Sequence, residues 1–398
     1  MKTAIQNRSL NFDDTSVAFA HQSNSKLRKT YLIFALMNQN WIVKIGTFFI
    51  KLAIKLGLPI KLLIKNTIFA QFCGGESIST CQKTVETLAK SKVGTILDYS
   101  VEGEDNEKDF DATTNEIFKT IDKAAEQKGN IPFSVFKVSG IGSVDLLEKV
   151  QEYPDNLEKE EALAYERIRN RVDKLCHHAA ELNVRIFLDA EESWIQDVID
   201  NLSYEMMKKY NNDNKTIVYN TYQLYRWESL QHLTDACEIA RKEGYKVGAK
   251  LVRGAYIEKE RRRAAEFEYK DPIHNTKEET DIDFNQSIHF AINNLDILSI
   301  CLGTHNEESC LLCINLMKEK NIKIDDKRIW FAQLLGMSDN ISYNLANAGY
   351  NVAKYVPYGP VEAVMPYLFR RAEENTSIAG QSSREFLLVK RERQRRLQ

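Results

Sequence analysis

Two adjacent arginines, Arg370 and Arg371, are the clearest candidates for a binding function in this sequence of 398 residues. They lie in the stretch YLFRRAEENTS, at residues 367–377. Guanidinium groups bind carboxylates and phosphates through paired hydrogen bonds. Neighbouring side chains on a helix point about 100° apart, so both reach one anion only if their helix crosses the mouth of a site. Glu374 stands at helical spacing from both and could hold either in place. The alternative is two surface charges.

Eight short apolar segments rich in β-branched and aromatic residues alternate with helix-length, charge-patterned segments. The strand-like segments are residues 94–100, 132–138, 184–190, 216–222, 246–252, 298–304, 328–334 and 351–357. Apolar strands that each precede a helix are typical of a parallel sheet covered on both faces. Eight such units predict an α/β fold, a (β/α)8 TIM barrel over residues 90–385. A doubly wound open sheet is the alternative.

Every predicted strand ends in a polar or ionisable residue, where the active sites of such barrels lie. These residues are Asp98, Lys137, Asp189, Gln223, Lys250 with Arg253, Thr304 with His305 and Asn306, Gln333, and Tyr355. Lys137 and Lys250 are the most informative, because a lysine in a buried strand is costly unless it is paired. Asp98 and Asp189 are the candidate partners.

Phosphate-binding glycine motifs are weak in this sequence. No GxGxxG occurs, and GIGS at residues 140–143 is better explained as a tight turn. The segment KLVRGAY at residues 250–256 is more suggestive. Arg253 and Gly254 directly follow a strand there, so a cation and a bare backbone could approach a phosphate or a polarised ring.

Six motifs, in this order and spacing, resemble the proline dehydrogenase family. They are LDAEES (188–193), NTYQ (220–223), KLVRGAY (250–256), GTHN (303–306), YVPYGP (355–360) and YLFRRAEEN (367–375). The resemblance implies a distorted (β/α)8 barrel that binds FAD and oxidises L-proline to Δ1-pyrroline-5-carboxylate. It also implies transfer of the electrons to a membrane quinone, as the first step of proline catabolism to glutamate. We expect the single-function form, without the aldehyde dehydrogenase or DNA-binding parts of fused bacterial relatives.

The resemblance implies that five residues contact proline: Lys137, Leu251, Tyr355, Arg370 and Arg371. The arginines and Lys137 would bind the carboxylate. Tyr355 would close over the pyrrolidine ring, and Leu251 would press that ring against the flavin. Three acids would support these residues from behind: Asp98, Glu102 and Glu374.

The resemblance also implies the FAD-binding residues: Ala190, Gln223, Lys250, Arg253, Gly254, Ala255, Thr304 and His305. Gln223 would bind the pyrimidine edge. Lys250 stands where many members have an arginine near N5, and either cation would stabilise charge on the reduced ring. Asp189 would support the site from beneath, so Asp189 and Lys250 are the expected catalytic residues. Hydride would pass from proline C5 to flavin N5, with no obvious dedicated base. No metal is expected.

Three other functions stay open. Hydroxyproline oxidation could use the same scaffold, but the resemblance implies that relatives preferring this substrate lack the tyrosine at Tyr355. A Schiff-base lyase could use Lys137 or Lys250 without a flavin. A membrane-bound scaffold with an inactive barrel is the non-enzymatic alternative.

The first 89 residues predict a helical arm with an unusual charge pattern. Residues 15–75 contain no acidic residue, but they contain eight basic ones: Lys26, Arg28, Lys29, Lys44, Lys51, Lys55, Lys61 and Lys65. The longest uncharged run, residues 30–43, is shorter than the roughly 20 residues that span a bilayer. The pattern predicts either a basic amphipathic helix on an anionic membrane or an arm packed on the barrel.

Composition limits partners and location. A net charge of −2 favours no nucleic-acid partner. Seven cysteines without a signal peptide favour a reducing compartment, and the lone pair Cys310 and Cys313 suggests buried thiols rather than zinc. We expect a bacterial cytoplasmic protein peripheral to the inner face of the membrane, or the mitochondrial inner membrane in a eukaryote. Residues 386–398 are expected to be a basic tail.

Overall fold

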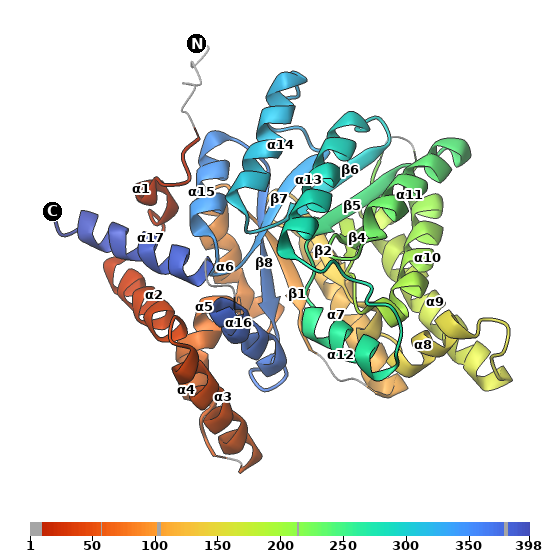
Figure 1. Ribbon diagram of the computed structural model, residues 1–398, viewed down its shortest axis with the longest axis horizontal. Helices are drawn as coiled ribbons and strands as arrows, with labels where there is room; N and C mark the ends of the chain where they lie inside the picture. Colours follow the sequence, from red (N-terminus) through yellow and green to blue (C-terminus); the bar gives the residue numbers. More distant parts are fainter. Residues whose placement is uncertain (1–9, 57, 102–104, 213–214, 378–380) are drawn as a thin grey trace.

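Eight parallel strands close into a barrel in chain order (Figure 1). The computed structural model describes residues 10–56, 58–101, 105–212, 215–377 and 381–398. The strands are β1 (Gly94–Tyr99), β2 (Phe133–Phe136), β3 (Arg185–Leu188), β4 (Val218–Gln223), β5 (Val247–Val252), β6 (Leu298–Gly303), β7 (Ile329–Leu334) and β8 (Val352–Tyr358). All eight predicted strands are confirmed, with small shifts at their ends.

Closure of the barrel depends on the pairing of β1 with β8. The register runs from Gly94 opposite Ala353 to Tyr99 opposite Tyr358, so the two strands pair along the whole length of β1. An open sheet would leave both of these strands as edges. The predicted barrel is therefore confirmed, and the open-sheet alternative is wrong.

Apolar side chains fill the lower part of the barrel interior. This inner cluster consists of Ile96, Phe133, Val135, Phe187, Tyr219, Cys301, Ala332 and Ala353. The rings of Phe133 and Phe187 stack with their centres 4.4 Å apart, and Tyr219 meets both edge-on. Because this plug is apolar and closely packed, the polar chemistry is expected at the C-terminal ends of the strands.

Helices surround the barrel and bury their apolar stripes against the outer faces of the strands. They are α6 (Ile78–Lys90), α7 (Glu107–Glu126), α8 (Val144–Glu152), α9 (Lys159–Glu181), α10 (Ser193–Tyr210), α11 (Ser229–Glu243), α13 (Lys277–Asn293), α14 (Glu307–Glu319) and α15 (Asp339–Ala348). The short helix α12 (Ile257–Glu266) instead buries Glu260, which accepts hydrogen bonds from Ser193 at the start of α10. Helix α6 buries Cys81, Val85 and Leu88 in the main core, so barrel packing begins before residue 90. All seven cysteines are buried and unpaired, and the prediction of two buried thiols at Cys310 and Cys313 is confirmed.

A second apolar cluster joins the two ends of the chain beside the barrel. The N-terminal arm forms α1 (Thr15–Ala18), α2 (Asn24–Met37), α3 (Asn40–Lys55), α4 (Lys61–Ile64), a π-helix (Lys65–Phe69) and α5 (Ala70–Phe72). Helix α2 packs against α17 (Gln381–Arg395) and also contacts α16 (Met365–Ser377). Residues 386–398, expected as a tail, instead lie in and just beyond α17, because Leu388 and Val389 are buried in this cluster.

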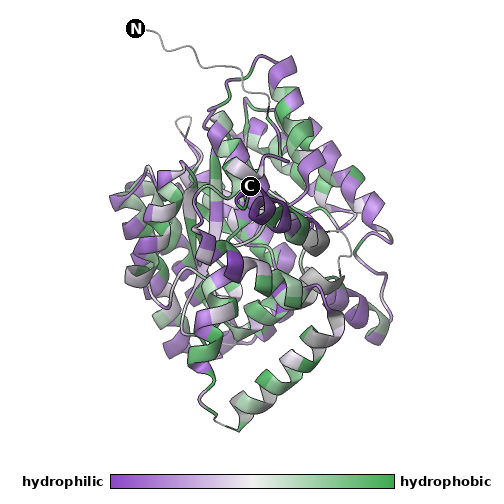
Figure 2. Ribbon diagram, turned by 90° about the vertical axis from the view of Figure 1, so that its left-hand side faces the viewer, coloured by the Kyte–Doolittle hydropathy of each residue, from purple (hydrophilic) through white to green (hydrophobic). Residues whose placement is uncertain are grey.

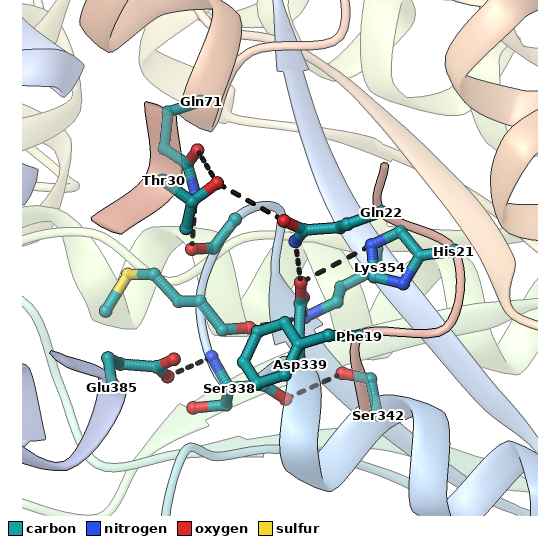
Figure 3. A network of polar contacts seen from close by, with 12 residues as sticks. Phe19, His21, Gln22, Thr30, Gln71, Ser338, Asp339, Ser342, Lys354 and Glu385 are labelled. Atoms are coloured by element: carbon teal, nitrogen blue, oxygen red, sulfur yellow. Dashed lines mark hydrogen bonds and ion pairs between the residues drawn. The ribbon is translucent and has the colours of Figure 1, made fainter. Parts of the chain in front are cut away.

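A buried lysine on the outer side of β8 anchors the loop between β7 and α15 (Figure 3). The side chain of Lys354 is 0% exposed, and its Nζ lies 3.0 Å from Asp339 Oδ1. The same ammonium donates hydrogen bonds to the carbonyl oxygens of Leu334 and Met337. Burial alone would raise the pKa of Asp339, but Lys354 and then His21 lower it below its usual value.

The same loop is held by both ends of the chain. From the arm, Gln22 Nε2 donates a 3.2 Å hydrogen bond to Asp339 Oδ2. From α17, the buried carboxylate of Glu385 accepts a hydrogen bond from the backbone N–H of Ser338. Burial and the neighbouring Asp339 raise the pKa of Glu385 to about 7. One polar network therefore connects the arm, the barrel and the last helix.

Replacing Lys354 by methionine should destabilise the fold strongly, because it leaves the carboxylate of Asp339 buried without its cation. Breaking a buried ion pair in this way costs about 3–5 kcal/mol of the free energy of unfolding. Urea unfolding of Lys354→Met measures the loss. The double variant Lys354→Met with Asp339→Asn should recover a large part of it, since no unpaired charge remains. Equal stability of the single and double variants would contradict this role of the pair.

Candidate active site

Three side chains from three strands form a buried polar cluster at the mouth of the barrel. Lys250 from β5 forms an ion pair with Asp189, which directly follows β3. The hydroxyl of Tyr355, from β8, donates a 2.5 Å hydrogen bond to the other oxygen of Asp189. Lys250 Nζ lies 4.7 Å from the centre of the Tyr355 ring. The structure thus pairs Lys250 with Asp189, one of its two candidate partners from the sequence, and adds the hydrogen bond from Tyr355.

The cluster explains how β5 can carry a lysine among apolar residues. Lys250 is only 6% exposed, and its ammonium lies 5.2 Å from the centre of the Phe187 ring below it. Asp189 supplies the compensating charge that a buried ammonium requires. Burial, and then the carboxylates of Asp189 and Asp98, raise the pKa of Tyr355, so its hydroxyl remains a donor.

A second group of charges surrounds the end of β2. Burial raises the pKa of Asp98, and the nearby positive charge of Lys137 opposes that rise. Lys137 therefore lies close to its predicted partner Asp98. The other proposed counter-charge, Glu102, lies outside the described residues.

Glu191 is a further buried acid beside Lys137 that sequence reasoning did not select. Its carboxylate accepts a 2.9 Å hydrogen bond from the backbone N–H of Ser139 and another from the Ser139 hydroxyl. Burial raises the pKa of Glu191 to about 7, against the lowering effect of Lys137 and Ser139. A signal was present, since Glu191 belongs to the LDAEES motif that follows a strand.

Gln223 joins the loops after β3 and β5. Its Nε2 donates a 2.7 Å hydrogen bond to the carbonyl oxygen of Glu191, and its Oε1 accepts one of 3.2 Å from the N–H of Ala255. Ala190 lies buried between Asp189 and Glu191. Gln223 therefore fixes the spacing of the two loops that frame the mouth.

Arg253 is held by three partners at the end of β5. Its guanidinium donates to Asp281 at 2.6 Å, to Thr304 Oγ1 at 2.7 Å and to Ser309 Oγ at 3.0 Å. It also lies 4.3 Å from the centre of the Phe284 ring. A guanidinium held in this way binds a phosphate group better than a mobile guanidinium would, because its side chain loses little conformational entropy on binding.

Gly254 has a backbone φ of +140°, and a Cβ atom there would lie 2.4 Å from the ring of Tyr225. The glycine is therefore required by its close approach to Tyr225 as well as by its conformation.

His305 extends the site toward the loop between β7 and α15. Its Nδ1 lies 2.8 Å from the hydroxyl of Ser338, the residue that Glu385 holds from α17. Burial, and then the positive charges of Lys354, Arg371 and Arg253, lower the pKa of His305 to about 3. The imidazole is therefore neutral, and positive potential gathers at this end of the barrel.

Arg370 and Arg371, both half-buried, act on different sides of the mouth. The guanidinium of Arg371 lies 5.3 Å from the centre of the Tyr367 ring, and its charge reaches His305. The charge of Arg370 instead reaches Tyr256, which follows β5. The two adjacent arginines of α16 thus act electrostatically on different loops, Arg371 on the residue after β6 and Arg370 on a residue after β5. Their expected orienter, Glu374, has a side chain outside the described part of the chain.

Tyr256 is a second site residue that sequence reasoning missed. Burial raises the pKa of its phenol, and the charges of Lys137 and Arg370 oppose the rise. Tyr256 is thus a buried phenol on which both cations act. The available signal was its position at the end of the KLVRGAY motif.

Leu251 lies beside Lys250 on β5 but faces another direction. Successive strand residues point to opposite faces, and Lys250 points into the barrel. Leu251 therefore faces the helices, where it is fully buried in the main core. The contact that the resemblance implies between Leu251 and the substrate ring therefore stays a prediction, and it would have to be made from the edge of this core.

The hydrogen-bond donors and cations at the mouth fit a ligand that has both an anionic group and a planar ring. Arg253 and Arg371 supply positive charge beside the neutral His305. Lys250 and Tyr355 supply a cation and a hydroxyl in a buried setting. Among the described residues, no group of three or more His, Cys, Asp or Glu side chains could hold a metal ion.

Comparison with known proteins identifies relatives of the chain. A family model described as proline dehydrogenase matches residues 81–384. The mitochondrial proline dehydrogenase 1 of Dictyostelium discoideum is 33% identical, over 96% of this chain and 75% of its own length. The carbapenem antibiotics biosynthesis protein CarD of Pectobacterium carotovorum subsp. carotovorum is 35% identical, over 82% of this chain and 84% of its own. The mitochondrial proline dehydrogenase 1 of Homo sapiens is 42% identical, over 60% of this chain and 40% of its own.

Solved structures support the fold independently. Proline utilization A (PutA) from Bdellovibrio bacteriovorus, inactivated by N-propargylglycine, superposes with a TM-score of 0.72 at 18% identity. This similarity covers 91% of the chain but only 38% of the longer PutA chain. A mutant PutA from Bradyrhizobium japonicum gives a TM-score of 0.67 at 17% identity. The family match over most of the sequence, together with the closed barrel, assigns this enzyme to the proline dehydrogenase family.

Proposed function

We propose that the enzyme oxidises L-proline to Δ1-pyrroline-5-carboxylate with FAD bound at the mouth of the barrel, and passes the electrons to a membrane quinone. The observation that carries this proposal is the convergence of the Asp189–Lys250–Tyr355 cluster with the cations of α16 and β2. Family membership supports proline as the substrate.

The proline carboxylate would lie between Arg370 and Lys137. Both charges lower the pKa of the buried Tyr256 phenol against the effect of burial, which supports a position of the two cations on either side of one anion. Guanidinium and ammonium groups together favour an anion at that position. The opposite end of the amino acid would then lie toward Tyr355, whose ring would pack on the pyrrolidine. Arg371, on the other side of α16, would serve the carboxylate and the cofactor side together.

FAD, when bound, supplies the acceptor for the hydride that leaves proline C5. Arg253 and Thr304 would hold its phosphates, with Ala255 and His305 beside them. Gln223 would bind the ring edge while maintaining the loop spacing, and Lys250 would stabilise negative charge near the acceptor atom. Asp189 keeps Lys250 and the Tyr355 hydroxyl in fixed positions, so it acts as a positioning residue.

The two remaining candidate reactions have less support. A Schiff-base lyase would need Lys250 to leave its ion pair with Asp189, or Lys137 to leave the neighbourhood of Asp98. Hydroxyproline would carry a hydroxyl into the space of the Tyr355 ring, which the hydrogen bond to Asp189 holds in place. Comparison of kcat/KM for the two substrates tests this preference, and equal values would refute it.

A quinone acceptor implies peripheral contact with the membrane that contains it. Within the described residues, no helix is both long and apolar enough to span a bilayer. In a bacterium the contact would be at the cytoplasmic face of the membrane, and in a eukaryote at the mitochondrial inner membrane. Two of the relatives are named as mitochondrial proteins.

The proposed reaction is tested by the visible spectrum of the purified protein. We expect a flavin spectrum after FAD is added, and anaerobic L-proline should bleach it. Glycine or L-alanine, which lack the ring, should leave it unchanged. A protein that remains colourless with FAD would contradict the cofactor. A flavin spectrum that proline does not bleach would contradict the reaction.

Arg370→Met should chiefly raise the KM for proline, because it removes a cation from the carboxylate site while the cofactor contacts remain. Loss of a charged hydrogen bond costs about 1.5–3 kcal/mol, which corresponds to a rise of roughly 10- to 150-fold.

Arg371→Met should raise KM as well and should also weaken FAD binding, since its charge reaches His305. Steady-state kinetics and flavin titration measure both effects. Arg328→Met, at the opposite end of the barrel, is the control.

Tyr355→Phe should lower kcat/KM about tenfold, because Asp189 loses one of the donors that position it. Tyr358→Phe is a matched control from the same strand. Its hydroxyl also binds a carboxylate, Glu116 at 3.1 Å, but on the outer face of the barrel. The control should retain normal kinetics even if its stability falls. Similar kinetic losses in both variants would mean that Tyr355 acts only through the fold.

A further inference from the structure

A row of large apolar side chains is exposed on the N-terminal arm. Eight of them fall between residues 41 and 63 and are 50–69% exposed: Trp41, Ile45, Phe48, Phe49, Leu56, Leu58, Leu62 and Leu63. Solvent-facing helix surfaces are normally polar, and contiguous apolar patches on a protein surface mark interaction sites. We call this row the arm face.

Half of the arm face lies on α3, a helix that projects from the body of the protein, and the other half follows it along the chain as far as α4. Helix α3 extends away from the barrel at the lower left of Figure 1, and Figure 2 shows it along the lower edge in mostly green and white. The helix packs against α2 and α16, and Ile50 and Ile60 are partly buried in the second core cluster. Its other side, including Phe48 and Phe49, remains open.

The charges around the arm face match an anionic surface. No Asp or Glu occurs between residues 15 and 75, where eight Lys and Arg residues do. The lysines described beside the face, Lys61 and Lys65, are about half exposed. Their ion-pair partners, Glu76 for both lysines and also Glu362 for Lys61, lie beyond this acid-free segment. Exposed aromatic rings next to lysines are typical of helices that lie in the headgroup region of a membrane.

The length of α3 shows whether this helix could span a bilayer or would lie parallel to the membrane surface. Its 16 residues extend about 24 Å, which is less than the hydrocarbon thickness of about 30 Å. The helix also contains Lys44, Lys51 and Lys55 along its sequence. Insertion parallel to the membrane surface is therefore the geometry that fits.

We propose that the arm face is the membrane-docking surface of the enzyme and that it binds anionic phospholipid with α3 lying in the plane of the interface. Because α3 contacts α16, the helix that carries Arg370 and Arg371, docking brings the opening of the barrel close to the lipid. This position would let a quinone ring approach from the bilayer, a part of the inference that rests on the proposed function.

Vesicle binding tests the proposal directly. The full-length protein should co-sediment with vesicles of phosphatidylcholine mixed with phosphatidylglycerol. Its binding should be weaker to vesicles of pure phosphatidylcholine, which carry no net charge. Binding to the mixed vesicles should also be weaker at high salt concentration, because salt screens the charges of the lysines. The triple variant Trp41→Ser, Phe48→Ser, Phe49→Ser should reduce binding by at least about tenfold. The matched control Ile239→Ser, Ile282→Ser, Leu311→Ser removes exposed apolar side chains from three barrel helices and should bind normally.

Activity assays separate the two proposals. The triple variant should retain proline oxidation with a soluble dye and lose it with quinone embedded in vesicles. Undiminished vesicle binding by the triple variant would overturn the docking surface. A dimer of the parent protein that the variant abolishes, without vesicle binding by either, would show instead that a second copy covers the face. If neither dye nor quinone is reduced while vesicle binding follows the expected pattern, the proposed reaction fails and the docking surface stands.

Discussion

The pairing of the first strand with the last is the interaction on which the rest of the structure depends. Asp98 comes from β1, Asp189 follows β3, Lys250 comes from β5 and Tyr355 from β8. These side chains share one small space only because β1 and β8 are hydrogen-bonded along the full length of β1. The aromatic residues beneath them fill the interior of the barrel, so the polar cluster lies at its mouth. Closure and packing together therefore determine where charge can be concentrated.

Two buried lysines of the barrel have opposite orientations and different consequences. Lys250 points inward, and its pairing with Asp189 organises the site. Lys354 points outward, and its pairing with Asp339 organises the loop that supports His305 through Ser338. Burying an ammonium group is expensive, so each lysine requires its carboxylate in a defined place. The two pairs thus link the geometry of the mouth to the packing outside the barrel.

The sequence predicted the strands well because each is a short apolar run bounded by charged helical segments. The polar residues at the ends of the predicted strands already included those that meet at the mouth, such as Asp189 and Lys250. The sequence did not reveal which of two neighbouring strand residues faces inward, as the burial of Leu251 in the main core illustrates. Orientation depends on the register of the closed sheet, which no local pattern encodes. Tyr256 and Glu191 were missed because they lie just beyond strand ends, where only the three-dimensional path of the loops determines proximity. Residues 386–398 were expected to be a tail because the segment is rich in basic residues. Its few apolar residues, which pack in the cluster with α2, were overlooked.

Segments near both ends of the sequence hold the loop between β7 and α15, and this affects the order in which the protein folds during synthesis. Gln22 holds Asp339 from the start of the chain, and Glu385 holds Ser338 from the end. During synthesis on the ribosome, all eight strands emerge before α17 is complete. A nascent chain could therefore close its barrel while Ser338, and with it His305, still lacks its final support. The support of Ser338 and His305 is thus completed only after α17 has been synthesised, at a stage when all the strands of the barrel are already available.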